Sequence, residues 1–376
     1  MPELPEVERA TRLLNEFGAG KMIVKVDTIE DTIVYAGVTH TDFAEVLTGR
    51  KLIQTHRYGK LFYMKLDGDG KQPVMHFGMT GMLHVKGQLP IHYREAPSNV
   101  TNPEWPPRWM KFILHLADPE SGQTTEIAFR DARRLGRIRL CVSPLSEPPI
   151  SELGFDPILS MPSLTEFSNI VGKRKGITVK ALLLDQSFSA GIGNWIADEV
   201  LYHARIHPEQ RCNTLSEDHL QILHEKIQYV CQTAISVNAD DSRFPGHWLF
   251  KHRWAKGKKS KDSVLQLVST RIFRAFRTPS NVLMEPSGEP ATIKWITVGG
   301  RTSAYVLELQ KLPSLPVLKG RDDEGENHEE TQPEVPEVRS PPSMKRKRLV
   351  QEPTPTRRSS RRSVRRLSAS AGGQIE

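Results

Sequence analysis

The stretch Ser189-Ala-Gly-Ile-Gly-Asn194 lies between two segments of helical pattern. Apolar residues recur with a period of 3.6 on both sides of it: Val179, Leu182 and Leu183 before, Ile196, Val200 and Leu201 after. The two glycines favour a tight turn, and asparagine is a good residue for a helix N-cap. The stretch therefore predicts two helices joined by a short turn, with Asn194 capping the second.

Helical patterns predominate around this stretch, and strand patterns predominate before about residue 150. Helical spacing continues through 163–240, where the apolar positions include Leu220, Leu223, Ile227 and Val230. Three earlier segments between glycine-rich or proline-rich turns predict strands: 60–66, 110–116 and 126–130. An amphipathic helix is predicted at the very start, from Val7, Ala10, Leu13 and Leu14. A β-rich domain led by one helix should precede a helical domain.

The C-terminal part contains a basic segment, a hairpin and a tail. Residues 251–261 are strongly basic, and residues 291–310 predict a β-hairpin centred on Gly299-Gly300. Beyond about 320 the chain is rich in Glu, Pro, Ser and Arg with almost no aromatic residues, so it cannot bury enough surface to order itself. This tail is acidic at first and ends in clusters such as Lys345-Arg-Lys-Arg348, which are open to three interpretations: a solvated tail, nuclear import or additional DNA contact.

Length and composition favour a basic two-domain protein with a tail. The chain has 376 residues, a formal net charge of +8 and a sequence pI of about 9.3, which favours a polyanionic partner. No apolar run is long enough to span a bilayer, and the start is acidic, so we expect a soluble protein that is not secreted. The three cysteines are far apart and form no metal or disulfide pattern, which fits a reducing compartment.

The first eight residues, Met1-Pro-Glu-Leu-Pro-Glu-Val-Glu8, have a chemical interpretation as well as a structural one. Removal of Met1 would leave Pro2 with a secondary amine, and an α-amino group has a pKa of about 8, low enough for it to act as a nucleophile. Its attack on the anomeric carbon of a sugar gives an iminium ion, and Glu3 beside it could act as general acid and base. The alternative is a plain helix start, in which proline and acidic residues are common.

Five segments in this order resemble the formamidopyrimidine-DNA glycosylase (Fpg/Nei) family, with Leu4 as in its Fpg branch. They are Pro2–Glu8, Arg57-Tyr-Gly-Lys60, His76-Phe-Gly-Met-Thr-Gly81, Asp131-Ala-Arg-Arg-Leu-Gly136, and Gly191-Ile-Gly-Asn194 followed by Ala197-Asp-Glu199. A sixth, Thr297-Val-Gly-Gly-Arg301, resembles the tip of the C-terminal hairpin of the family. The resemblance covers residues 2–312 and is interrupted near 262–285, which we interpret as an insertion.

The resemblance implies a role for each motif. Pro2 would be the nucleophile, Glu3 the acid and base, and Lys60 a phosphate contact that assists catalysis. Three residues would probe the helix around a flipped base, as side chains that replace a lost stacking partner do: Met79, Arg133 and Leu135. Phosphate would be bound by Asn194 and Arg301, and Lys180 would lie near the damaged nucleotide. Glu199 would be structural or close to the site.

Two positions differ from the usual pattern of the family. Leu135 stands where a phenylalanine is expected, so the wedge has volume but no π face. The hairpin has no cysteines, which resembles the zincless finger of plant and fungal members, so packing would replace the stabilisation by a metal.

The implied fold class is α+β. We expect an N-terminal catalytic β-sandwich with a leading α-helix at 1–150 and a helix-two-turn-helix domain at 151–250. The basic segment, insertion and zincless-finger hairpin would occupy 251–312, and a disordered acidic-then-basic tail 313–376.

The implied function is a bifunctional DNA glycosylase and abasic-site lyase of base excision repair. It would remove oxidised bases through a Pro2 Schiff base and cut the strand by β,δ-elimination, without metal or other cofactor. The partner would be damaged double-stranded DNA, with no membrane, a monomeric state and a nuclear location. Two alternatives stay open: a catalytically inactive relative that binds damaged DNA, and a basic ribosome- or chromatin-associated scaffold.

Overall fold

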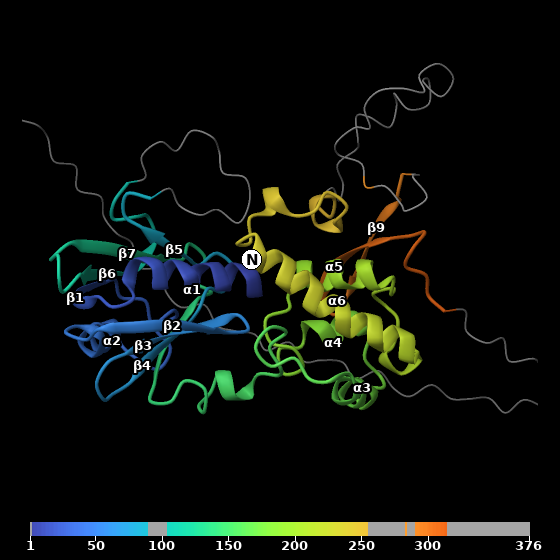
Figure 1. The fold of residues 1–376 in the computed structure, drawn as a ribbon, viewed down its shortest axis with the longest axis horizontal. Helices are drawn as coiled ribbons and strands as arrows, with labels where there is room; N and C mark the ends of the chain where they lie inside the picture. The colour runs from blue at the N-terminus through green and yellow to red at the C-terminus, as the bar shows by residue number, and fades with distance from the viewer. Residues whose placement is uncertain (1, 89–103, 255–282, 284–289, 314–376) are drawn as a thin grey trace, which may run out of the picture. The chain divides into compact units, whose positions relative to one another are not determined.

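The structure is a computed structural model, and it describes residues 2–88, 104–254, 283 and 290–313. The basic residues from 255 onward, most of the insertion at 262–285 and the tail from 314 lie outside the described residues, so the predictions made for them stay predictions. The described part combines antiparallel sheets with a helical region (Figure 1), as the α+β prediction requires.

The N-terminal half is a β-sandwich that begins, in sequence, with a helix. Helix α1 (Leu4–Gly18) comes first, and α2 (His40–Leu47) lies between β1 and β2. One sheet has the strand order β1 (Met22–Thr28), β6 (Met110–Ala117), β7 (Thr124–Arg130), β5 (Met82–Val85). The other has the order β2 (Leu52–Tyr58), β3 (Leu61–Leu66), β4 (Gln72–His76), β8 (Arg137–Cys141). All of these neighbours pair antiparallel.

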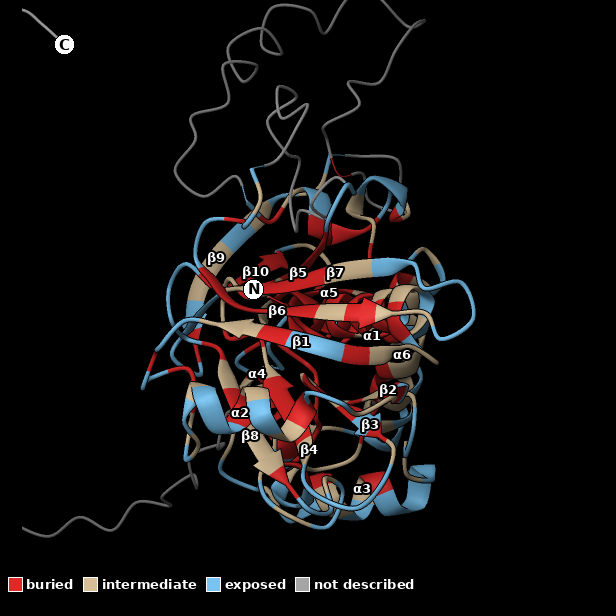
Figure 2. Ribbon diagram, turned by 90° about the vertical axis from the view of Figure 1, so that its left-hand side faces the viewer, coloured by how far each residue is buried: buried red, intermediate tan, exposed pale blue. Residues whose placement is uncertain are grey.

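One apolar core holds the two sheets together. A chain of phenylalanine rings crosses it, with centroid separations of 4.7 Å for Phe62–Phe77, 5.5 Å for Phe77–Phe129 and 5.4 Å for Phe129–Phe112. Figure 2 shows the buried parts of both sheets in red. Helix α1 adds Val7, Ala10 and Leu14 to the same core, as its sequence pattern predicts.

The second half is helical and ends in a hairpin. Its helices are α3 (Leu164–Gly172), α4 (Val179–Leu184), α5 (Asn194–Ala204) and α6 (Glu217–Ser236), with short 3-10 turns at Ile150–Glu152, Cys212–Thr214, Asp241–Arg243 and Leu249–Lys251. Strands β9 (Ile293–Val298) and β10 (Arg301–Val306) pair antiparallel. Gly299 and Gly300 both have positive φ, 59° and 70°, as a two-residue type I′ turn requires. The predicted hairpin is confirmed.

One local prediction is wrong by a residue. Helix α5 begins at Asn194, and its N-cap is Gly193. A side chain at 193 would collide with Glu3, because an added Cβ would lie 2.3 Å from the Glu3 Cδ. The amides at the start of α5 are capped instead by the side chain of Glu3, near the N-terminus of the chain.

Candidate functional site

The start of α1 and the start of α5 are joined by Glu3. Its buried carboxylate accepts hydrogen bonds from the backbone N–H groups of Gly193 (2.9 Å), Trp195 (3.0 Å) and Ile196 (3.1 Å). These are amides that an isolated helix leaves without partners. The amide of Glu3 itself donates to Glu6 Oε2 at 2.9 Å. Glu3 is therefore fixed by two helix termini at once, and the preceding residue, Pro2, is buried at their junction.

Two glycines bring a third segment to this junction. Gly59, in the β2–β3 turn, and Gly191, before α5, both have positive φ, 57° and 101°. A Cβ on Gly59 would lie 2.7 Å from Ala190 Cβ, and one on Gly191 would lie 2.8 Å from Leu4 Cβ. The amide of Leu4 also donates to the Gly191 carbonyl at 3.1 Å. Three motifs that are far apart in the sequence thus meet in space.

Lys60 follows Gly59 in the β2–β3 turn, and its side chain reaches the glycine-rich turn before α5. Its Nζ donates to the Ile192 carbonyl at 2.8 Å, an oxygen that also accepts from Gln186 Nε2 at 2.9 Å. Burial, and to a smaller extent the charge of Arg301, lowers the pKa of Lys60. Burial and then the charge of Lys60 lower the pKa of His76 to about 4. The charge of Arg301 thus acts on Lys60, and the charge of Lys60 acts on His76 at the start of the 76–81 loop.

The β2–β3 turn is anchored by an acid that the sequence motifs did not reveal. Asp156 is fully buried and accepts from the Gly59 amide at 2.8 Å and from the guanidinium of Arg57. Arg57 Nε also donates to Glu8 at 2.9 Å. The turn that presents Lys60 is thereby fixed to both halves of the chain.

The two predicted probing loops pack against each other. Thr80 Oγ1 donates to Asp131 Oδ1 at 2.6 Å and accepts from the Arg133 amide at 3.2 Å. A Cβ on Gly78 would lie 2.3 Å from the backbone of Leu135, so only glycine allows this approach. Arg133 is exposed, Leu135 is 40% exposed and Met79 is half-buried. The fold thus brings Met79, Arg133 and Leu135 together.

Lys180 lies inside the fold. It is fully buried, pairs with Asp198 and donates to the Asn194 carbonyl at 2.9 Å. Asp198 also binds Arg253 and accepts from the Ala304 amide at 3.2 Å. This position favours a structural role for Lys180, holding α4, α5 and the hairpin together, over direct contact with a nucleotide.

The hairpin reaches the start of α5. Asn194 Nδ2 donates to the Thr302 carbonyl at 2.8 Å, and its Oδ1 has no hydrogen-bond partner among the described residues. Asn194 and Thr302 line a hollow of about 180 Å³ together with Arg253, Trp254, Trp295 and Ala304. Arg301, at the hairpin tip, is exposed. Glu199 is buried and accepts from the amides of Leu249 (3.0 Å) and Phe250 (2.7 Å), which is a structural role.

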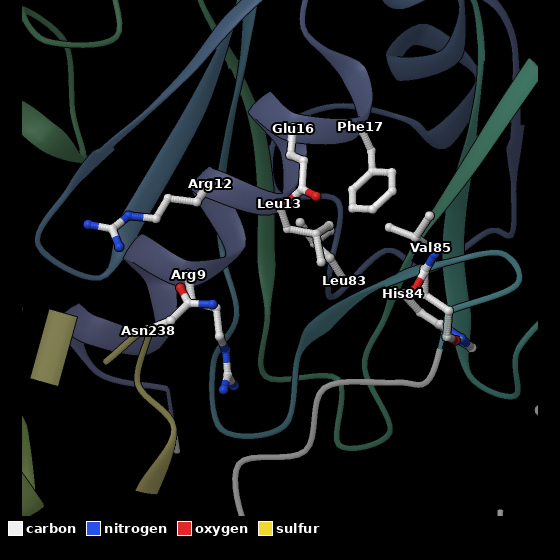
Figure 3. Close-up of a pocket in the computed structure, with 10 residues that line it drawn as sticks. Arg9, Arg12, Leu13, Glu16, Phe17, Leu83, His84, Val85 and Asn238 are labelled. Carbon is white, nitrogen blue, oxygen red and sulfur yellow. The ribbon is translucent and has the colours of Figure 1, made fainter. Parts of the chain in front are cut away.

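A larger hollow, of about 250 Å³, lies away from this junction. It is lined by residues of α1, among them Leu13 and Phe17, and by Leu83 and Val85 of β5 (Figure 3). None of the residues that the sequence motifs single out lines it. In the described ranges there is no group of three metal-binding side chains, and none of the helices there is long and apolar enough to cross a membrane.

The described residues form a β-sandwich, a helical domain that contacts it through Glu3 and the β2–β3 turn, and a hairpin that contacts the start of α5. This arrangement is that of the helix-two-turn-helix DNA repair proteins. The family model described as "Formamidopyrimidine-DNA glycosylase N-terminal domain" matches residues 1–138, and "Formamidopyrimidine-DNA glycosylase H2TH domain" matches 153–245. The chain therefore belongs to the formamidopyrimidine-DNA glycosylase family, and it is a DNA glycosylase.

Individual relatives agree with this assignment. The chain is 40% identical over 313 residues to formamidopyrimidine-DNA glycosylase of Arabidopsis thaliana, covering 83% of this chain and 71% of that protein. It is 35% identical over 245 residues to the protein of that name from Heliobacterium modesticaldum, covering 65% and 82%. The fold resembles the Lactococcus lactis enzyme bound non-covalently to DNA with an abasic site, with a TM-score of 0.58, 23% identity and coverage of 82% and 99%.

Proposed function

We propose that this DNA glycosylase acts in base excision repair by removing an oxidised base and then cutting the strand at the abasic site. One observation carries the proposal: Glu3 is fixed by three amides at the start of α5, those of the N-cap Gly193 and of Trp195 and Ile196, so Pro2 lies where α1, α5 and the Lys60 turn meet. A nucleophile, an acid and a cation are thereby gathered from three parts of the chain.

The chemistry uses the amine of Pro2 once Met1 is removed. The amine nitrogen attacks C1′ of the deoxyribose, the base leaves, and Glu3 protonates the ring oxygen as the C1′–O4′ bond opens. Glu3, now a carboxylate, removes a C2′ proton, and the iminium takes up the electron pair to give an enamine. Collapse of the enamine expels the 3′ phosphate. A second elimination expels the 5′ phosphate, and water then releases Pro2.

The DNA would contact two sets of residues. Lys60, Asn194 and Arg301 supply phosphate contacts, since the first two lie by the N-terminus of α5 and Arg301 is exposed nearby. Met79, Arg133 and Leu135 enter the space left by the flipped base. Lys180 supports this surface from beneath, through Asp198.

Borohydride trapping tests the proposal. Reduction of the iminium on abasic DNA should link the protein to the strand, and Pro2→Gly or an uncleaved N-terminal tag should suppress the adduct. Trapping that survives both changes, with a lysine as the linked residue, would show that Pro2 is not the nucleophile. Binding without base removal or trapping would favour the inactive damaged-DNA-binding relative.

The replacement of the usual phenylalanine wedge by Leu135 bears on which lesions the enzyme prefers. Ring-opened purines and hydantoins stack and pair poorly, so they lose least when the wedge is Leu135. We therefore propose fast removal of formamidopyrimidines and hydantoins and slow removal of 8-oxoguanine. Single-turnover rates on matched duplexes test this, and equal rates for formamidopyrimidine and for 8-oxoguanine opposite cytosine would contradict it.

The tail and the assembly state complete the proposal. The basic clusters near the C-terminus would direct the protein to the nucleus, and the protein would act as a monomer. Deleting residues 340–376 should then abolish nuclear accumulation while leaving the excision rate unchanged.

The domain limits 1–150, 151–250, 251–312 and 313–376 belong to the same proposal and can be tested by limited proteolysis.

A further inference from the structure

Trp109 is a large aromatic residue that the fold leaves at the surface. It is 45% exposed, and its φ of 62° lies in the left-handed region that bulky residues rarely adopt. Arg134, on a neighbouring loop, has a φ of 55°. Sparsely populated backbone conformations concentrate at functional sites. Two of the five non-glycine residues with positive φ in the described ranges therefore lie at the same end of this sheet.

The sheet places Trp109 beside the two probing loops. Strands β5, β7 and β6 lie side by side (Figure 2), and Arg130 pairs with Met82 on one side and Met110 on the other. Three segments therefore lie at the same end of these strands: the Met79 loop before β5, Trp109 before β6 and the 131–136 loop after β7. The Trp109 carbonyl also accepts a hydrogen bond from the Asp131 amide at 3.0 Å, which ties Trp109 to the base of the second loop.

Two arginines flank the indole. The guanidinium carbon of Arg108 lies 4.6 Å from the ring centroid of Trp109, and that of Arg130 lies 5.7 Å from it. Arg108 is exposed, and Arg130 is half-buried. An aromatic face beside cations is suited to a nucleic acid, because the ring stacks on a base while the cations attract the phosphates. A partner protein with an acidic surface would account for the two arginines but not for the exposed aromatic ring between them.

We propose that Trp109 is a nucleobase-contacting residue. Its indole stacks on the orphaned base, which loses its pairing partner when the damaged nucleotide leaves the duplex. This inference rests on the proposed function, because it requires a flipped nucleotide at the adjacent loops. It also accounts for Leu135, since the π surface that leucine lacks is supplied by the segment next to it.

Binding by the full-length protein gives the first test. The probes are a duplex with a tetrahydrofuran abasic analogue and the same duplex without it. Trp109→Ala should weaken binding to the abasic duplex roughly tenfold, within the range seen for base–aromatic stacking, and Trp109→Phe should retain most of the affinity. The salt dependence should stay unchanged, since no charge is removed. Val142→Ala, which truncates another exposed apolar side chain, is the control and should have no effect.

The fluorescence of 2-aminopurine opposite the abasic analogue gives the second test, because stacking quenches it. Trp109→Ala should raise the emission of the complex, and Trp109→Phe should not. Thermal unfolding of each variant shows whether it folds, and Trp109→Phe keeps the test decisive if the alanine variant does not. Unchanged affinity and emission in Trp109→Ala would overturn the inference, as would a lowered salt dependence.

The two proposals fail in different ways. If the wild type forms the borohydride adduct and Trp109→Ala binds normally, only the inference about Trp109 is wrong. If the wild type forms no adduct, the proposed lyase chemistry is wrong, and the binding data still decide whether the indole contacts DNA.

Discussion

Two buried acids serve helix α5 in different ways. Glu3 accepts three backbone N–H groups at the start of the helix, and among the described residues it has no ion-pair partner. Asp198, one turn into the helix, is held by two cations, Lys180 and Arg253. Amide donors fix the orientation of a carboxylate without supplying a counter-charge, whereas two cations neutralise it. We propose that Glu3, which lies beside Pro2, serves the chemistry, whereas Asp198 holds Lys180 and Arg253 in place.

Replacing Glu3 should have the largest effect. Glu3→Gln should slow base removal by roughly 10²- to 10⁴-fold, the usual contribution of a general acid, because a carboxamide does not exchange a proton near neutral pH. Cleavage of a preformed abasic site should lose less, since departure of the base and ring opening need the acid most. Single-turnover rates on lesion-containing and abasic duplexes measure the two steps. Equal loss of both would assign Glu3 a purely structural role, like that of Asp198.

Replacing Asp198 should instead affect the whole molecule. Asp198→Asn leaves Lys180 and Arg253 buried without their counter-charge, which should lower the free energy of unfolding by about 3–5 kcal/mol. Both reaction steps should then fall in parallel, in proportion to the folded fraction. Chemical denaturation measures the stability, and Asp69→Asn, in an exposed turn, is the control. A selective loss of base removal would show that Asp198 belongs to the chemistry.

This contrast also marks what the sequence could predict. Local patterns predicted α1, α5, α6 and the hairpin, because periodicity and a Gly-Gly turn depend only on neighbouring residues. The partners of Glu3 lie about 190 residues away, and no local rule places them. The preference of asparagine for N-caps therefore assigned the cap to Asn194, whereas a distant carboxylate does the capping.

Motifs also leave the burial of a side chain open. The resemblance to the family implies that Lys180 lies near the damaged nucleotide, and the fold encloses its ammonium with Asp198. Asp156 and Trp109 were not singled out, since nothing in their neighbouring residues indicates a buried anchor or a positive φ. Burial and backbone geometry depend on the whole fold, so they escape motif-based prediction.

The pH dependence of stability sharpens the comparison at Glu6. Burial, and then the charge of Glu3, raises the pKa of Glu6 to about 7. A carboxyl whose pKa is raised by folding stabilises the protein fully below its unfolded pKa, and this stabilisation is lost as the pH rises through 7. From pH 5 to pH 8, Glu6→Gln should gain about 2 to 3 kcal/mol relative to the wild type. Denaturation at the two pH values measures this, and Glu16→Gln, exposed on the same helix, should show no such gain.

The smallest effect is expected at the hairpin tip, where an exposed charge contrasts with both buried acids. Arg301 has no ion-pair partner among the described residues, and it is close enough to Lys60 to lower the pKa of that residue, after burial. Under the proposed function, Arg301 contacts a DNA phosphate. Arg301→Ala should therefore reduce the slope of log affinity against log salt by about one, with a modest loss of affinity for any duplex. Lys294→Ala removes an exposed charge from β9 of the same hairpin and should leave the slope as it is. If both variants bind with the wild-type slope, the hairpin does not hold DNA, and its contacts with Asn194 and Ala181 are structural alone.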